Sequence, residues 1–254
     1  FMSKRDTSKI ISSWLKAPYD QETRDEIGRL QEEDPEALQD AFYQDLSFGT
    51  GGMRGIMGVG TNRMNIYTIG KATQGLANYI NENLKENDHP AVVICYDSRH
   101  HSQEFAMHAA CILAGNEIDV WISSELRPTP FTSFIMRQKK AVAGIMLTAS
   151  HNPPEYNGYK VYGPDGAQVV APHDQGIIDA FRQVSSISDI KLAKEDSSHI
   201  KRIDPSEDQA FIKAIEKHRL HPKEAQDFGQ QIKILYSSLH GCGITLIPPA
   251  FKAW

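Results

Sequence analysis

The sequence is poor in cysteine and has no long apolar run. Its 254 residues include three cysteines, Cys95, Cys111 and Cys242, which lie far apart and are odd in number. This pattern predicts neither a disulfide framework nor a cysteine-based zinc site. No apolar stretch approaches the roughly 18 residues that cross a bilayer, which argues against a membrane-spanning protein. The charged start, Phe1 to Asp6, has no apolar secretory core behind it, so we expect a cytoplasmic protein.

The sequence also lacks a strong charge of one sign. Its 27 Lys and Arg residues stand against 32 Asp and Glu, a formal net charge of -5. Such a chain has no general attraction for nucleic acid or for an anionic membrane, so we expect neither as a partner. Any anionic ligand must be held by a local cluster of cations. A composition of 40% hydrophobic and 23% charged residues excludes a disordered chain and suits one or two globular domains.

Apolar spacing predicts a helical arm followed by an α/β unit. Apolar residues recur at helical spacing over 8–44, and an amphipathic helix is expected from Asn65 to Leu84. Between these helices, Gly49 to Gly55 has the composition of a loop whose backbone can approach a phosphate closely. Beyond them, apolar runs predict strands over 91–96, 118–122 and 142–147, separated by helices over 102–114 and 130–138. This order predicts an α/β fold with a mostly parallel sheet sandwiched by helices.

The remaining segments modify this sheet and then begin a second unit. Residues 158–162 and 167–170 flank a turn and predict a hairpin, which makes the sheet mixed. A helix is expected over 172–184. We interpret the polar stretch 185–204 as a domain boundary, followed by a helix over 207–218 and a strand over 232–237.

The end of the sequence has more apolar side chains than so short a unit can bury. They are Ile232, Ile234, Leu235, Ile244, Leu246, Ile247, Phe251 and Trp254. We therefore expect an incomplete, loosely packed second α/β unit that rests on another chain or on further sequence. The predicted ranges are an N-terminal helical arm at 1–45, a first domain at 46–204 and the beginning of a second domain at 205–254.

Ser150 is the strongest candidate for a reactive residue. The apolar strand before it runs directly into Thr148-Ala149-Ser150-His151-Asn152-Pro153. Ser150 therefore falls at the carboxyl end of a predicted parallel strand, where open α/β sheets place their ligands. A serine at such an edge can act as a nucleophile. The alternative interpretation is a simple turn, because Asn and Pro are common turn residues.

Three cationic residues are expected to meet Ser150 in space. Arg54 ends the glycine-rich segment and suits bidentate phosphate binding. Arg99 follows Asp97 at the end of another predicted strand, and Lys160 lies on the predicted hairpin. Each has a structural alternative: an ordinary glycine-rich loop for the segment of Arg54, a strand end with an aspartate cap and a surface arginine for Arg99, and a solvated lysine for Lys160. Because strand ends share one edge of a parallel sheet, we expect these side chains to converge.

Two other kinds of site are weaker. His101, Glu104 and His108 have a spacing that suits metal ligands on one helix face, but no further ligand lies nearby in the sequence. A serine hydrolase would need a base beside Ser150. The G-x-S-x-G motif is absent, and in an extended segment the side chain of His151 is expected to point away from Ser150.

Together these segments resemble the α-D-phosphohexomutases, the phosphoglucomutase and phosphomannomutase superfamily. The resemblance runs from about Leu46 to the end of the sequence. It is carried by the serine motif with Asn157-Gly158-Tyr159-Lys160, and by Gly49 to Gly55, Tyr96-Asp97-Ser98-Arg99, Pro128-Thr129-Pro130 and Leu239-His240-Gly241. The helical arm and the sequence from Gly52 to Asn65 resemble the branch that includes phosphopentomutase and glucose-1,6-bisphosphate synthase.

The resemblance implies an enzyme that interconverts sugar 1-phosphate and sugar 6-phosphate. Ser150 would carry the phosphoryl group and form a sugar bisphosphate intermediate, with a sugar 1,6-bisphosphate as activator. Lys160 would act as acid or base on a sugar hydroxyl, which requires a lowered pKa. Arg54 would contact phosphate, and His151 would hold the loop and bond near the phosphoserine.

The resemblance also implies further ligands. Arg99 and Asn152 would bind phosphate, and a phosphate oxygen on Ser150 would bind Mg²⁺. The family's Asp-Gly-Asp-x-Asp-Arg metal loop, its Gly-Glu-x-Ser-Gly sugar loop and its last phosphate loop are not found in this sequence. We therefore expect a truncated chain with little turnover alone. The alternatives are an inactive fragment, and a phosphopentomutase or glucose-1,6-bisphosphate synthase.

Overall fold

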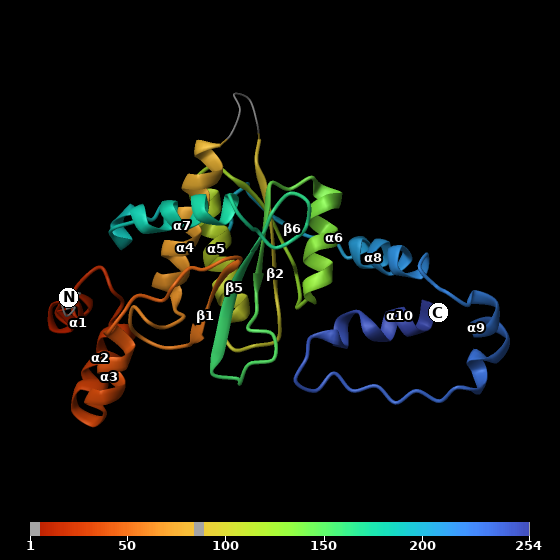
Figure 1. The fold of residues 1–254 in the computed structure, drawn as a ribbon, viewed down its shortest axis with the longest axis horizontal. Helices are drawn as coiled ribbons and strands as arrows, with labels where there is room; N and C mark the ends of the chain where they lie inside the picture. Colours follow the sequence, from red (N-terminus) through yellow and green to blue (C-terminus); the bar gives the residue numbers. More distant parts are fainter. Residues whose placement is uncertain (1–5, 84–88, 254) are drawn as a thin grey trace.

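A six-stranded mixed sheet forms the centre of the structure, a computed structural model that describes residues 6–83 and 89–253 (Figure 1). The strands are β1 (Gly52–Ile56), β2 (Ala91–Tyr96), β3 (Asp119–Ile122), β4 (Ala143–Leu147), β5 (Tyr156–Tyr162) and β6 (Ile200–Arg202). Their order across the sheet is β1-β5-β4-β2-β3-β6. Strand β2 is parallel to β3 and β4, and β3 is parallel to β6. Strand β5 is antiparallel to both β4 and β1. The predicted mixed α/β sheet is confirmed.

Helices cover both faces of this sheet, as predicted. The helices of the sheet domain are α4 (Ile66–Glu82), α5 (Ser102–Gly115), α6 (Thr129–Lys139) and α7 (His173–Gln183). Helices α4, α5 and α7 pack together on one face, and α6 covers the other (Figure 1). The short 3-10 helices are η1 (Ile187–Asp189), η2 (Gly229–Gln231) and η3 (Gly243–Thr245).

Side-chain alternation along β2 divides the core between the two faces. Val92, Ile94 and Tyr96 belong to the cluster under α4 and α5, whereas Val93 and Cys95 belong to the cluster under α6. Successive residues of a strand point to opposite faces, so a strand buried on both sides reads as one continuous apolar run. Burial raises the pKa of the Cys95 thiol to about 11, which leaves it an uncharged apolar filler. All three cysteines are free.

The predicted helical arm is present and has its own small core. It consists of α1 (Thr7–Trp14), α2 (Gln21–Glu33) and α3 (Pro35–Phe42). Its buried cluster includes Ile27 and Phe42, and the ring of Trp14 stacks on Tyr19 and meets Tyr67 of α4 edge to face. The hydroxyl of Tyr67 also bonds to Asp20. This aromatic contact fastens the arm to the start of α4.

The predicted loop at Gly49 to Gly55 is present only as far as Gly52, where β1 begins. Gly49 and Gly52 exchange two backbone hydrogen bonds in a tight turn, and the chain then continues as β1. The predicted hairpin arm at 167–170 is reduced to one bridge between Tyr162 and Gln168. The reason is that a strand has two edges: β4 takes one edge of β5 and β1 takes the other.

The polar stretch 185–204 contains a strand that its composition does not predict. Ile200–Arg202 forms β6 and extends the sheet beside β3. As the last strand it is partly exposed to solvent, so polar side chains are compatible with it.

The segment after residue 205 is helical and open. It contains α8 (Ser206–Glu216), α9 (Pro222–Phe228) and α10 (Ile247–Ala253). The predicted strand at 232–237 is wrong, because the segment pairs with no other strand in the described part of the chain and therefore lacks the hydrogen bonds that define a sheet.

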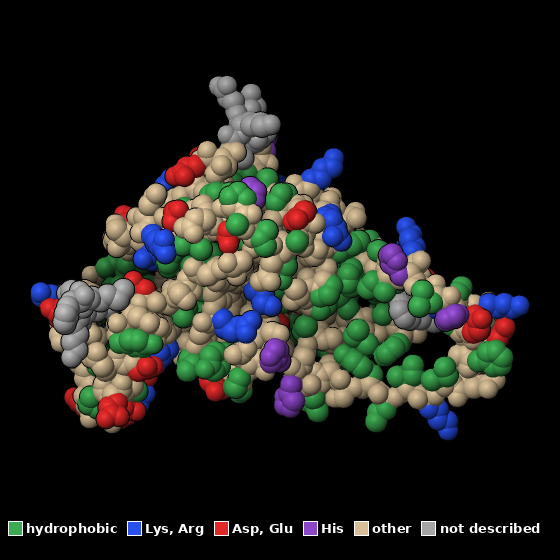
Figure 2. Space-filling model, viewed as in Figure 1, with side chains coloured by type: hydrophobic (Ala, Val, Ile, Leu, Met, Phe, Trp, Pro, Cys, Tyr) green, Lys and Arg blue, Asp and Glu red, His purple; other side chains and the backbone are tan. Residues whose placement is uncertain are grey.

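The expected loose packing of this segment is confirmed for the described residues. Ile232, Ile234 and Leu235 are 65%, 62% and 99% exposed, whereas Leu246 is 3% exposed. Figure 2 shows hydrophobic side chains gathered over this part of the surface, at the right of the view. Trp254 lies outside the described residues, as do most of the charged start and Leu84, the last residue of a predicted helix. No helix among the described residues has the length and apolar character to cross a bilayer.

Replacing Gly52 by alanine is expected to destabilise the sheet. Its φ is +133°, and a Cβ atom there comes within 1.9 Å of the carbonyl oxygen of Tyr159. A rare backbone conformation costs a residue with a side chain about 1–3 kcal/mol, and the clash adds to this cost. The matched control is Gly28→Ala in α2, where a Cβ meets nothing within 4 Å. We expect Gly28→Ala to stabilise by roughly 0.5–1 kcal/mol. Urea unfolding measures both, and equal effects would refute the assigned role of Gly52.

Candidate active site

Ser150 lies on a tight loop between β4 and β5. Strand β4 ends at Leu147, and the backbone N–H of Thr148 donates to the carbonyl oxygen of Gly158 at 2.9 Å, which closes the base of the loop. The backbone N–H of Ser150 donates to Thr148 Oγ1 at 2.9 Å. Ser150 itself has a φ of +59° and an exposed side chain. The predicted position at a strand end is confirmed.

The expectation that His151 points away from Ser150 is wrong. Ser150 Oγ lies 3.2 Å from His151 Nδ1, within hydrogen-bond distance. The expectation assumed an extended segment, in which adjacent side chains diverge. The positive φ of Ser150 bends the chain instead, and the imidazole returns toward the hydroxyl.

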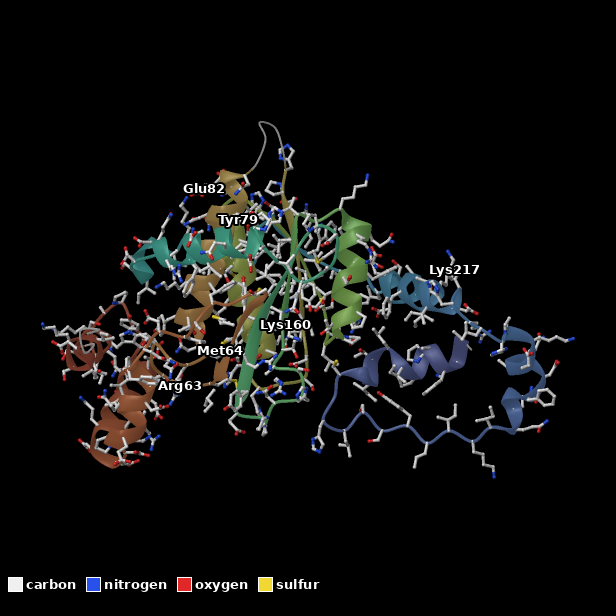
Figure 3. All side chains as sticks on the ribbon, viewed as in Figure 1. Arg63, Met64, Tyr79, Glu82, Lys160 and Lys217 are labelled. Carbon is white, nitrogen blue, oxygen red and sulfur yellow. The ribbon has the colours of Figure 1, made fainter. Side chains whose placement is uncertain are left out.

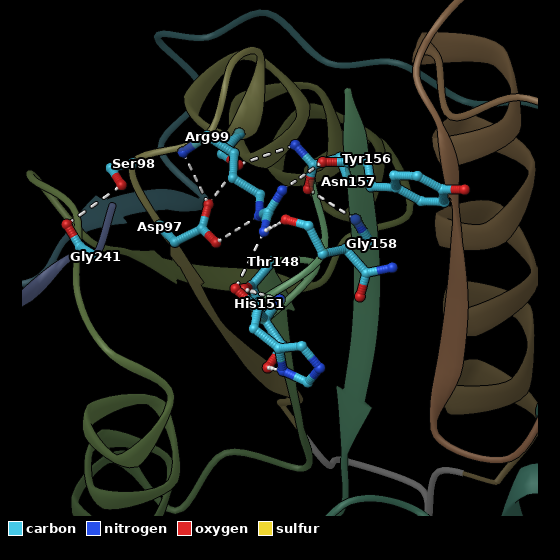
Figure 4. A network of polar contacts seen from close by, with 12 residues as sticks. Asp97, Ser98, Arg99, Thr148, His151, Tyr156, Asn157, Gly158 and Gly241 are labelled. Carbon is cyan, nitrogen blue, oxygen red and sulfur yellow. Dashed lines mark hydrogen bonds and ion pairs between the residues drawn. The ribbon is translucent and has the colours of Figure 1, made fainter. Parts of the chain in front are cut away.

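The side chain of Arg99 bonds to the backbone of the loop and pairs with Asp97, and Arg99 also lines the cleft described below. Its guanidinium donates to the carbonyl oxygens of Ser150, Asn152, Pro153 and Tyr156 (Figure 4). The predicted convergence on the Ser150 edge is confirmed, but the geometry does not favour the predicted phosphate-binding role. A guanidinium has five N–H donors, and those of Arg99 are already engaged.

Arg54 and Lys160 form the cationic side of the site. Arg54 Nη1 donates to Asn152 Oδ1 at 3.0 Å, which links β1 to the loop. Lys160 lies in the middle of β5 (Figure 3). Burial lowers the pKa of the Lys160 ammonium, and the positive charge of Arg54 lowers it further; the carboxylate of Asp97 opposes both. The direction of this pKa shift agrees with the one that the resemblance requires.

Ser150 faces a cleft of about 780 Å³. One wall is the start of α6 at Thr129, and helix N-termini favour anions because their backbone N–H groups are unpaired. Another wall is the turn with His240 and Gly241, and the hydroxyl of Ser98 donates to the carbonyl oxygen of Gly241 at 3.4 Å. The cleft therefore combines segments that are far apart in the sequence.

The described residues do not form the metal site that the spacing of His101, Glu104 and His108 suggested. His101 Nδ1 lies 2.5 Å from Glu104 Oε2, but His108 is turned toward α4, near Gly70. Burial lowers the pKa of the His108 imidazole. No group of three or more His, Cys, Asp or Glu side chains within 6–83 and 89–253 could hold a metal ion.

The same finding bears on the Mg²⁺ ion that the resemblance implies. Asp97 is the carboxylate that lines the cleft, and it already pairs with Arg99 and accepts a hydrogen bond from Ser102 Oγ. The described residues alone do not fit a complete Mg²⁺ site.

Three residues of the site were not among the predicted functional residues. Asp97 holds Arg99, and His240 lines the cleft. The fully buried Asn157 donates through Nδ2 to the carbonyl oxygen of His100 and to Ser102 Oγ. Asp97 and Asn157 have a signal in the sequence, since each stands directly beside an apolar strand core. The signal for His240 is its place in Leu239-His240-Gly241, one of the segments that carry the resemblance.

Comparisons with known proteins agree with this fold. The family described as phosphoglucomutase/phosphomannomutase, alpha/beta/alpha domain I, matches residues 45–188. The chain is 38% identical over 221 residues to a phosphoglucomutase of Staphylococcus aureus, covering 85% of this chain and 38% of that protein. It is 33% identical over 255 residues to a human phosphopentomutase, covering 96% of this chain and 41% of that protein.

Solved structures share the fold at lower identity. A putative phosphomannomutase from Thermus thermophilus has a TM-score of 0.66 at 24% identity, covering 82% of this chain and 43% of that one. A Paramecium parafusin has a TM-score of 0.62 at 17% identity, covering 83% and 42%. This chain spans well under half the length of these relatives. Because the family match covers more than half of the chain, the chain belongs to the phosphoglucomutase/phosphomannomutase family.

Proposed function

We propose that Ser150 is the phosphoryl carrier of a sugar-phosphate mutase. The observation that carries this proposal is an exposed serine hydroxyl on a strand-end loop, with His151 Nδ1 at 3.2 Å and the cations Arg54 and Lys160 on the same edge. Transfer of a phosphoryl group depends mainly on positioning and on neutralising the charge of its oxygens. The names of the relatives, phosphoglucomutase and phosphopentomutase, support a sugar phosphate as substrate.

In the first step the serine takes a phosphoryl group from a sugar bisphosphate. Ser150 Oγ attacks phosphorus, the bond from phosphorus to the sugar oxygen breaks, and that oxygen leaves with the electron pair. The hydroxyl proton passes to His151 Nδ1, and the leaving oxygen takes a proton from Lys160. Arg54 binds the phosphate oxygens and balances their charge.

In the return step the phosphoserine gives its group to a sugar hydroxyl. The hydroxyl oxygen attacks phosphorus and the bond from phosphorus to Ser150 Oγ breaks. Neutral Lys160 accepts the sugar proton, and His151 returns a proton to Ser150 Oγ. A sugar 1,6-bisphosphate serves as the activator because it supplies the first phosphoryl group. Repeated at the other end of the sugar, these two steps exchange 1-phosphate and 6-phosphate.

Mg²⁺ remains part of the proposal for the whole protein, with a phosphate oxygen on Ser150 as one ligand. Its other ligands must then come from outside the described residues, since these offer no group of three candidate side chains. No step above depends on the ion. The exposed apolar side chains after residue 230 are proposed to pack on further protein, from the same chain or another one.

Ser150→Ala is expected to abolish phosphorylation of the native protein by glucose 1,6-bisphosphate, because it removes the hydroxyl that lies beside His151 Nδ1 on the strand-end loop. Peptide mass mapping after incubation measures the label. The matched control is Ser133→Ala on α6, outside the residues that line the cleft, which should be labelled like wild type. A wild-type label on another residue, with Ser150 unmodified, would sink the proposal.

The alkaline dependence of the return step should follow Lys160. Its neutral form increases as pH rises through its lowered pKa, so the rate rises with pH and reaches a plateau. Arg54→Gln removes a positive charge that lowers this pKa. The inflection of the pH–rate profile should therefore move to higher pH, in addition to any loss of rate. The control Arg63→Gln alters an arginine that pairs with Asp40 of the arm and should leave the inflection unchanged. An unmoved inflection in Arg54→Gln contradicts the assignment of Lys160.

The 254-residue chain alone should stay at background in converting glucose 1-phosphate to glucose 6-phosphate. It spans 38% of the first relative's length, and its described residues offer no group of three side chains that could hold the Mg²⁺ ion and so neutralise phosphate charge. Each tenfold change in rate corresponds to about 1.4 kcal/mol of activation free energy. Losing several kcal/mol of charge stabilisation in the transition state therefore lowers the rate to the background of the assay. A coupled spectrophotometric assay decides, and robust turnover by the purified chain refutes this expectation.

A further inference from the structure

We propose that Arg99 is a positioning residue that holds the Ser150 loop in its bent conformation and thereby aims Ser150 Oγ into the cleft. This inference deepens the proposed function, on which its catalytic part rests. It also replaces the phosphate-binding role that the sequence suggested for Arg99.

The guanidinium of Arg99 bonds to both limbs of the loop. Nη2 donates to the carbonyl oxygens of Ser150 at 3.1 Å and Asn152 at 2.6 Å. Nη1 donates to those of Pro153 at 2.8 Å and Tyr156 at 3.0 Å. One planar group therefore bonds to four carbonyls spread over seven residues. Backbone hydrogen bonds close two separate turns of the loop, from the N–H of Asn152 to the carbonyl oxygen of Ala149 and from the N–H of Tyr156 to that of Pro153, both at 3.1 Å. Arg99 bonds to carbonyls of both turns and so holds them together.

Arg99 is itself fixed in place by Asp97 at the end of β2. Asp97 Oδ2 lies 3.4 Å from Arg99 Nε, and Asp97 Oδ1 accepts from the backbone N–H of Arg99 at 3.0 Å and from Ser102 Oγ at 2.9 Å (Figure 4). The side chains of Arg99 and Asp97 are only 12% and 11% exposed. The loop is thus bonded to the end of β2 and the start of α5, two rigid parts of the sheet domain.

The need for such a clamp follows from the conformation of Ser150. Its φ of +59° lies in the left-handed region, which is unfavourable for a residue with a side chain. Such a conformation persists only where the surroundings impose it. The bond from Arg99 to the Ser150 carbonyl is one of the contacts that impose it. Lysine cannot replace Arg99, because an ammonium lacks the planar fork that reaches four acceptors.

The experiment compares Arg99→Lys, Arg99→Ala and the control Arg63→Ala in the native protein. Arg63 is an arginine of similar burial, 14% exposed, that bonds to the arm and not to the loop (Figure 3). Hydrogen exchange of the backbone amides of residues 150–157 reports on the loop without requiring activity. Both Arg99 variants should exchange there at least about tenfold faster, with β2 and β4 protected as in wild type. Arg63→Ala should exchange like wild type.

A kinetic readout separates positioning from substrate binding. A misplaced nucleophile should lower kcat for glucose 1-phosphate roughly 100-fold and leave KM within about threefold, whereas loss of a phosphate ligand raises KM. Added guanidinium ion should restore part of the kcat of Arg99→Ala and none of that of Ser150→Ala.

Two results overturn the proposal: unchanged loop exchange in Arg99→Ala, or a raised KM with kcat unchanged. A protein that takes no phosphoryl label even as wild type refutes the proposed function instead, and hydrogen exchange still tests the clamp. If the sheet of Arg99→Ala unfolds, Asp97→Asn provides the milder test, since it weakens the anchor and should speed exchange in the same loop.

Discussion

The site depends on the pairing of β4 along both of its edges. Its parallel partner β2 and its antiparallel partner β5 run in opposite directions beside it. The end of β2 supplies Asp97 and Arg99, and the start of β5 closes the loop that carries Ser150. With the parallel strand β2 alone, Asp97 and Arg99 would lie at this edge of the sheet, but no strand would close the loop that carries Ser150. The change of direction within the sheet thus creates both a short rigid loop and the cations around it.

The arginines of this edge have different roles because their surroundings differ. Arg99 is buried beside a carboxylate and surrounded by carbonyl oxygens, so its charge is balanced within the protein. Arg54 is exposed and bonds to a neutral amide, and its charge reaches Lys160. One arginine therefore holds the loop, and the other remains available to a ligand.

Predictions from the sequence failed where the outcome depended on a distant neighbour. The glycine-rich segment reads as a loop because glycine is unfavourable in strands, yet β5 offers a free edge that makes part of it β1. The opposite error occurred at 232–237, where an apolar pattern suited to a strand has no partner among the described residues. Apolar pattern shows what a segment can form, whereas pairing requires an available edge.

The sequence by itself determined the α/β class, the order along the chain of the sheet-domain helices and of β2, β3 and β4, and the position of Ser150 at the carboxyl end of β4. These follow from local apolar periodicity and from the rule that parallel strands share their carboxyl ends. The tertiary structure alone decided the pairing of β1, the hydrogen bond between Ser150 and His151, and the bonds of Arg99 to the backbone of the loop. Each of these depends on backbone angles and on contacts between residues distant in the chain, which no local pattern encodes.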